Sequence, residues 1–105
     1  MIDYNIEFTK GILFVRFFGI LNSSNKENIE NDLIEIIKDG GIKYLVFNVE
    51  ELEIEDDNDL FKNCENILKE NDGKMLICGS YNGNFIKDFN YVDDELAAIK
   101  EFSLC

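Results

Sequence analysis

Apolar and polar residues alternate at the start of the chain and predict two paired strands. Every second residue between Ile2 and Phe8 is apolar, which is the period of a strand with one face in solvent. Lys10-Gly11 offers a turn, and residues 12–18 are dense in aromatic and branched side chains. We therefore predict an antiparallel hairpin with residues 2–9 as the outer strand, and we expect Gly19 to close or kink the second strand.

A helix is predicted after this hairpin. Ser24-Asn25-Lys26-Glu27 has the pattern of a capping box, in which the Ser24 hydroxyl accepts from the Glu27 amide and the carboxylate reaches back. Gly40-Gly41 offers a left-handed stop at the other end. Between these ends, apolar residues recur at the spacing of one helical face, namely Ile29, Leu33, Ile36 and Ile37.

The middle of the chain predicts a buried strand and a second helix. Residues 44–49 are almost continuously hydrophobic, as in a central strand that is covered on both faces. An acidic segment from Glu50 to Asp59 follows this strand. The second helix ends at Asn71-Asp72-Gly73, and its apolar face comprises Leu60, Cys64, Ile67 and Leu68.

The last third of the chain predicts two short strands and a helix. Residues 74–78 form a short buried strand, residues 79–84 are loop-like, and residues 89–92 form a last edge strand. Asp93 or Asp94 caps the final helix. The whole order is strand, strand, helix, strand, helix, strand, strand, helix, which places the chain in the α/β class as one domain over residues 1–105.

Charge and composition exclude several kinds of partner. The 105 residues include 10 basic and 22 acidic side chains and no His, so the formal net charge is −12. This charge repels phosphate backbones and anionic lipid headgroups, so we expect no nucleic acid partner and no membrane insertion. Ile12 to Leu21 is the longest mostly apolar stretch and is too short to cross a bilayer. The first residues lack a basic segment and a continuous apolar run, so we expect a cytoplasmic protein.

The candidate chemistry is sparse. Without His, neither a Ser-His-Asp arrangement nor a His-containing metal site can be built, and the glycines complete no phosphate-binding fingerprint. Cys64 and Cys78 fall in apolar segments and are interpreted as inert core thiols, and Cys105 is interpreted as incidental. We therefore expect a protein that is not an enzyme, with no catalytic residue, no metal and no cofactor.

Acidic residues gather between Leu52 and Leu60, where the chain enters the second helix. Carboxylates at a helix N-terminus stabilise it by about 0.3–1 kcal/mol each, and on this interpretation Asp57 or Asn58 is a simple cap. A helix start in an open α/β sheet also lies near the strand ends, where partners dock. A calcium loop is disfavoured because the central glycine and the final bidentate Glu are missing.

Two local patterns and the order of elements resemble a known family. Gly19-Ile20-Leu21-Asn22 is similar to a Gly-x-Leu-Asp motif that precedes a helix, and Asp56-Asp57-Asn58-Asp59 falls where that family has Asp-Ser-Ser-Gly. Residues 44–52 and 91–99 resemble its central strand and its last strand and helix. The family is the STAS domain, the fold of bacterial anti-sigma factor antagonists (anti-anti-sigma factors), and the resemblance spans nearly the whole chain.

The resemblance implies a STAS-like (SpoIIAA-like) fold, a mixed β-sheet with an N-terminal hairpin and helices packed on it. It also implies a regulatory domain in signalling and transcription that binds a protein partner, such as an anti-sigma kinase-like protein or another signalling protein. Asn58 stands at the position of the family's phosphoserine, and Asp57 and Asp59 could mimic a permanently modified state. The partner-binding residues implied are Asn22, Ser23, Ser24, Asp56, Asp57, Asn58 and Asp59.

Two other functions remain open from the sequence. One is an aspartyl-phosphate receiver or phosphatase-like enzyme with Asp56 or Asp57 as the nucleophile, for which Lys87 or Lys100 would have to supply the lysine. The other is an accessory STAS-like subunit of a transporter. The sequence also leaves open whether residues 79–89 form a partner-binding loop, and whether their three aromatic side chains form an exposed patch or complete the core.

Overall fold

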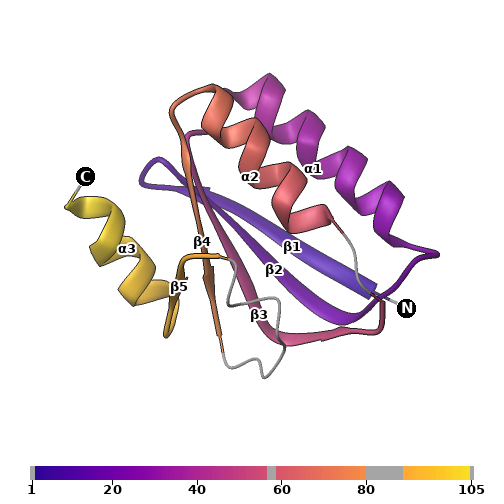
Figure 1. Ribbon diagram of the computed structural model, residues 1–105. Coiled ribbons are helices and arrows are strands. Elements are labelled where there is room, and N and C mark those ends of the chain that lie inside the picture. The colour runs from indigo at the N-terminus through magenta and orange to yellow at the C-terminus, as the bar shows by residue number, and fades with distance from the viewer. Residues whose placement is uncertain (1, 57–58, 80–88, 105) are drawn as a thin grey trace.

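A five-stranded mixed sheet with helices on both faces organises the protein (Figure 1). The computed structural model describes residues 2–56, 59–79 and 89–104. The strands follow the order β1-β2-β3-β4-β5 across the sheet; β1 pairs antiparallel with β2, and the other pairs are parallel. The elements are β1 (Ile2–Thr9), β2 (Ile12–Leu21), α1 (Lys26–Gly40), β3 (Tyr44–Ile54), α2 (Leu60–Glu70), β4 (Lys74–Cys78), β5 (Tyr91–Val92) and α3 (Glu95–Ser103).

The predicted class and order of elements are confirmed, including the central position of β3. Helices α1 and α2 cover one face of the sheet and α3 lies on the other (Figure 1). None of the helices in the described ranges is long and apolar enough to cross a membrane.

The opening hairpin forms as predicted. Lys10 and Gly11 both adopt positive φ, at 55° and 79°, as a two-residue turn between right-twisted strands requires. Thr9 pairs with Ile12, and the side chains of β1 alternate between half-buried and exposed positions over most of its length. The expectation that Gly19 closes the second strand is wrong, because β2 continues to Leu21; Gly19 lies within the strand and has a φ of 116°.

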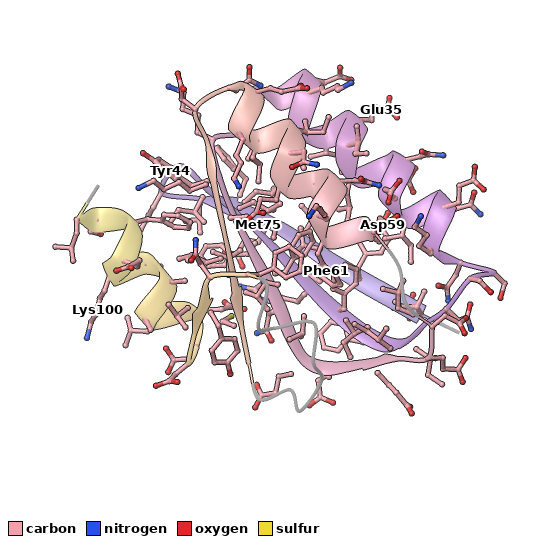
Figure 2. All side chains as sticks on the ribbon, viewed as in Figure 1. Glu35, Tyr44, Asp59, Phe61, Met75 and Lys100 are labelled. Carbon is pink, nitrogen blue, oxygen red and sulfur yellow. The ribbon has the colours of Figure 1, made fainter. Side chains whose placement is uncertain are left out.

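The larger core layer lies between the sheet and the α1–α2 pair. At its centre, Phe17 stacks on Phe47 with ring centroids 5.6 Å apart, and Phe61 of α2 meets Phe47 edge-on at 5.0 Å. Phe61 points from α2 toward the sheet in Figure 2. Phe89 is half-buried and packs against this layer, so it contributes to the core; Tyr81 and Phe85 lie outside the described residues.

Strand β3 is longer than predicted. Asn48 pairs with Arg16, and Glu51 pairs with Phe18, so β3 accommodates one extra residue between these pairs. A bulge of this kind shifts the alternation of side chains by one position, which turns Leu52 toward the helix layer together with Val49. The glutamates after Val49 can therefore belong to the strand, because the bulge keeps them on the face opposite α1 and α2, away from the larger core layer.

Two helix caps test the predictions at the ends of helices. The predicted Ser24–Glu27 capping box is wrong, because α1 begins after Asn25, which makes no side-chain cap hydrogen bond, and the Ser24 hydroxyl donates to Asn22 Oδ1 at 2.8 Å. The predicted cap on α3 is confirmed for Asp94, whose carboxylate accepts from the Ala97 N–H at 2.8 Å. The left-handed stop is confirmed at Gly41, with a φ of 60°.

The last strand is shorter than predicted, and the two described cysteines are buried. The strand predicted over residues 89–92 comprises only Tyr91–Val92. Cys64 and Cys78 are fully buried, and burial raises the pKa of each thiol to about 12, which confirms that both are core residues. Cys105 lies outside the described residues.

Candidate functional site

The sheet topology brings two of the implied partner-binding segments together. Strands β2 and β3 are parallel neighbours that end in register at Leu21 and Ile54, so the chain leaves both strands at the same edge of the sheet. The Glu55 N–H extends this pairing by donating to the Leu21 carbonyl at 2.9 Å. Residues separated by more than thirty positions in the sequence therefore meet at one corner of the molecule. We call this surface the acidic corner and define it as Asn22, Ser23, Ser24, Glu55, Asp56 and Asp59.

Side-chain hydrogen bonds connect the two segments of the acidic corner. The Ser23 N–H donates to Asp56 Oδ2 at 2.9 Å, and the Asn22 side-chain amide donates to Glu55 Oε1 at 3.2 Å. On its other side, Asn22 Oδ1 accepts from the Ser24 N–H at 3.0 Å and from the Ser24 hydroxyl. The backbone turn before α1 is thus held by short polar side chains that form an Asx-type turn.

Asp59 follows Asp56 by three positions and begins a third segment, helix α2. It occupies the N-cap position of α2 but makes no side-chain cap hydrogen bond, and its carbonyl accepts from the Asn63 N–H at 2.8 Å. Its side chain is exposed at the start of α2 (Figure 2). The prediction that Asp57 or Asn58 is the cap is therefore wrong, because Asp59 holds the N-cap position. Asp57 and Asn58 lie outside the described residues, so the assignment of Asn58 to the position of the phosphoserine stays a prediction.

Three residues of this region escaped the sequence analysis. Glu55 binds Asn22 as described above. Asn25 supports the turn, since its Oδ1 accepts from the Asn22 N–H at 3.0 Å and its amide donates to the Ile20 carbonyl at 2.9 Å. Asn63 of α2 donates to Glu30 of α1 at 3.0 Å and ties the two helices together behind the corner. The sequence feature that could have identified the role of Asn25 is its spacing from Asn22 around two serines, which is typical of an Asx turn as well as of a helix cap.

A second polar cluster lies on the sheet face that carries α3. Arg16 of β2 binds both carboxylate oxygens of Glu95, at 2.7 and 2.8 Å, and also contacts Glu7 at 2.9 Å and Asn5 at 3.1 Å on β1. The Asn48 amide donates to the same Glu95 at 2.9 Å. The hydrogen bonds from Arg16 hold the pKa of Glu95 below its ordinary value, and the same contact raises the pKa of Arg16. This cluster fastens the start of α3 to the sheet.

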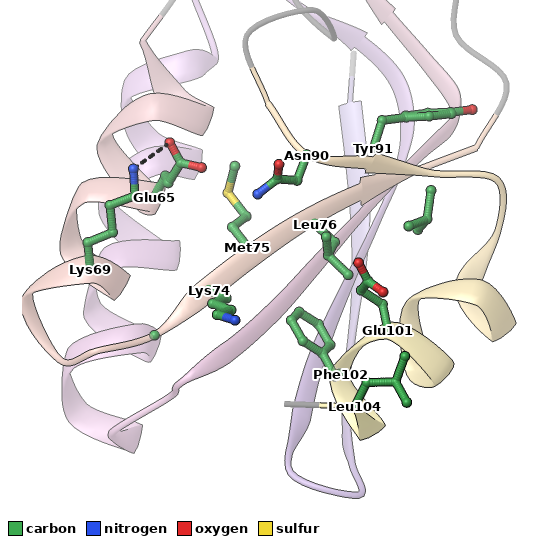
Figure 3. Close-up of a pocket in the computed structure, with 12 residues that line it drawn as sticks. Glu65, Lys69, Lys74, Met75, Leu76, Asn90, Tyr91, Glu101, Phe102 and Leu104 are labelled. Carbon is green, nitrogen blue, oxygen red and sulfur yellow. Dashed lines mark ion pairs between the residues drawn. The ribbon is translucent and has the colours of Figure 1, made fainter.

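A groove of about 630 Å³ lies between α2, β4 and α3 (Figure 3). Met75, Leu76 and Phe102 provide apolar lining, and Glu65 and Lys69 form an ion pair at 3.6 Å on the α2 side. Among the described residues that line it, the charged groups are two glutamates and two lysines, so these residues give the groove no net preference for an anion or a cation.

The lysines required by the receiver or phosphatase-like alternative are not brought to the acidic corner by the described residues. Lys100 lies on α3, on the face of the sheet opposite α2, whereas Asp59 lies at the start of α2 (Figure 2). Lys87 lies outside the described residues. The corner is therefore a cluster of exposed carboxylates, hydroxyls and amides, which suits recognition of another molecule through hydrogen bonds and charge.

A comparison with models of known protein families finds no match. Among solved structures, the chain is similar to the anti-sigma factor antagonist SpoIIAA in its unphosphorylated form, with a TM-score of 0.80 and 20% identity over 96% of this chain and 98% of that chain. The phosphorylated form of SpoIIAA, a Bacillus cell fate determinant, has a TM-score of 0.76 and 19% identity over 95% of this chain and 99% of that chain. An anti-sigma factor antagonist from Mycobacterium paratuberculosis has a TM-score of 0.81 and 14% identity over 96% of this chain and 93% of that chain. These similarities show that the chain has a STAS-like, SpoIIAA-like fold.

Proposed function

We propose that this protein is a non-enzymatic regulatory domain that binds a protein partner through the acidic corner. The observation that carries the proposal is the contact of the Ser23 N–H with the Asp56 carboxylate, which joins two distant segments into one exposed surface. The same fold in anti-sigma factor antagonists supports a partner of the anti-sigma kinase-like or another signalling class. On this proposal the protein acts in the cytoplasm of a bacterium, in the regulation of transcription.

We further propose that this corner is not regulated by serine phosphorylation at the position of the family's phosphoserine. One structural neighbour is a phosphorylated antagonist, and the resemblance places Asn58 of this chain at the phosphorylated position. An amide side chain offers no hydroxyl to a kinase. Asp57 and Asp59 flank this position and supply lasting negative charge, whereas a phosphoserine would supply roughly −1.5 to −2 charges only when modified.

The docking proposal is tested by capture with matched charge variants. The bait Asp56→Lys/Asp59→Lys reverses two charges of the corner, and Asp39→Lys/Glu70→Lys reverses two at the C-terminal ends of α1 and α2. Both pairs change the net charge equally, and circular dichroism confirms that each folds. We expect a protein retained by the wild type and by the control pair to be lost from the corner pair, as identified by mass spectrometry. Unchanged recovery of every captured protein on the corner pair would contradict the proposal.

The absence of phosphorylation is tested by intact mass. The protein is incubated with ATP and the kinase-like proteins captured in the previous experiment, and its mass is measured over time. We expect no added phosphate within residues 56–59. An Asn58→Ser variant tests whether the hydroxyl is the missing element, and stoichiometric phosphate on the wild type in this segment would refute the proposal.

A further inference from the structure

The sheet face that carries α3 is only half covered. Helix α3 packs on β3, β4 and β5, where Phe102 meets Tyr44 with ring centroids 4.8 Å apart. Under α3, the buried strand residues of this layer come from the first halves of β2 and β3 and from β4, and they end at the Arg16–Glu95 ion pair. Beyond this ion pair, the second halves of β2 and β3 have no helix over them within the described residues (Figure 1).

The uncovered half carries apolar side chains between rows of carboxylates. Phe18 and Ile20 follow Arg16 at alternate positions of β2 and therefore share its face, and Phe18 is 45% exposed. Phe18 is flanked by Asp3 on β1 and by Glu51 on β3. We call this surface the open strip and define it as Asp3, Phe18, Ile20, Glu51 and Glu53.

The bulge in β3 is what creates the open strip. Without the extra residue after Asn48, strict alternation would turn Glu51 and Glu53 toward the helix layer. The bulge is supported by Asn48, whose Oδ1 accepts from the Glu50 N–H at 3.0 Å, and by Gly79, whose position leaves no room for a side chain beside Glu50. The architecture of the strand thus presents two carboxylates beside an exposed phenyl ring.

We propose that the open strip binds a basic amphipathic helix of a partner protein, alongside α3. Phe18 and Ile20 are two residues apart on a strand, or about 6.6 Å, which is close to the rise of about 6 Å between positions i and i+4 of a helix. Neighbouring strands are about 4.8 Å away on each side, so a helix about 10 Å wide along β2 carries its flanking side chains over Asp3 and Glu51. This inference is independent of the acidic corner.

Charge decides what kind of helix fits. The three carboxylates of the open strip are exposed, and the chain has a net charge of −12, so Lys or Arg side chains beside the apolar row complement it. A second copy of the same chain would bring another −12 and is repelled. The helix α3 provides an internal precedent, because it places Phe102 on the sheet and has an ion pair to Arg16 at its start.

The probe is a fluorescein-labelled peptide of about 15 residues, built from Leu and Lys with the leucines at positions i, i+3, i+4 and i+7. Its affinity is measured by anisotropy at low salt. We expect Phe18→Ala to weaken binding by about five-fold or more, and Glu51→Lys/Glu53→Lys by about ten-fold or more. Amide chemical shift changes in ¹⁵N-labelled protein are expected to map to the second halves of β2 and β3.

Matched variants distinguish the open strip from general attraction to an acidic protein. Phe8 is 61% exposed in the same hairpin but lies on the other face, so we expect Phe8→Ala to leave the affinity within about two-fold, as should Asp39→Lys/Glu70→Lys. A peptide of the same composition without the leucine stripe should bind more weakly. Equal losses in the strip variants and their controls, shift changes elsewhere, or self-association abolished by Phe18→Ala would each overturn the proposal. The proposed corner is tested separately, by the capture experiment.

Discussion

The two faces of the sheet differ in how completely they are covered. The face under α1 and α2 is closed by a continuous apolar layer in which Phe17, Phe47 and Phe61 interlock. The opposite face has a smaller layer under α3, then the Arg16–Glu95 ion pair, then exposed side chains such as Phe18. The first face specifies the fold by packing, and the second leaves part of the same sheet available for recognition.

The largest expected effect comes from the closed face. Phe47 is fully buried and contacts two other rings, so Phe47→Ala leaves a cavity and should lower the free energy of unfolding by about 3–5 kcal/mol. Phe18→Ala on the open strip should change it by at most about 0.5 kcal/mol. Urea unfolding followed by circular dichroism measures both. Similar losses in the two variants would show that the faces do not differ as described.

The next effect concerns the bulge after Asn48, which decides which residues of β3 point to each face of the sheet. A Cβ at Gly79 would lie 2.7 Å from the Glu50 nitrogen, and φ at this position is +104°, so Gly79→Ala should cost about 2 kcal/mol of unfolding free energy or more. Gly11→Ala is the matched control, because φ there is also positive but a Cβ meets nothing within 4 Å. If urea unfolding gives the same loss of unfolding free energy for both variants, the close packing of Gly79 against the bulge does not contribute to stability.

A smaller effect is expected at the border between the covered and open halves. Hydrogen bonds from Arg16 hold the pKa of Glu95 below its ordinary value, so this contribution to stability is present above about pH 4.5 and is lost as the pH falls through the lower pKa of the folded state. Glu95→Gln should therefore lower the free energy of unfolding by about 1 kcal/mol at pH 7.

The pH series supplies the control for this ion pair. The difference between wild type and Glu95→Gln should shrink as the pH is lowered below the ordinary carboxyl pKa, in chemical denaturation series at fixed ionic strength. Glu7→Gln removes a more exposed partner of the same Arg16 and should have a smaller effect at pH 7. A pH-independent difference for Glu95→Gln would contradict the assignment.

The rates at which the two buried cysteines react with a thiol reagent report how readily each face of the sheet opens. Cys64 belongs to the closed layer and Cys78 to the layer under α3, and burial raises the pKa of both to about 12. We expect neither to react quickly with iodoacetamide at pH 8, with Cys78 modified before Cys64 because its layer is smaller and opens more readily. Peptide mass mapping over time, with urea-unfolded protein as the reactive control, measures the order. Faster modification of Cys64 would reverse the ranking of the faces.

The sequence predicts most of the fold because its helices and strands carry clear periodicities. The alternation in β1 and the helical spacing around Leu33 depend only on which face of an element is buried, so local patterns suffice. The second half of β3 was missed because the bulge after Asn48 breaks the period of two, and the extent of a bulge depends on the neighbouring strand.

The candidate site was less predictable for a related reason. Resemblance placed Ser23 and Asp56 in one surface, and the parallel register of β2 and β3 shows how they meet. The capping box was wrong because Ser24 bonds Asn22 instead, a competition between an Asx turn and a cap that sequence alone does not decide. The ion pair of Arg16 with Glu95 spans 79 positions and depends on where α3 docks, which no local pattern records.

The most direct test of the proposed function is a calorimetric titration with the purified captured partner. It compares the wild type, the corner pair Asp56→Lys/Asp59→Lys and the control pair Asp39→Lys/Glu70→Lys. We predict that the corner pair weakens the affinity by about ten-fold or more while the control pair stays within about two-fold of the wild type. Equal affinities of the corner pair and the wild type would contradict docking through the acidic corner.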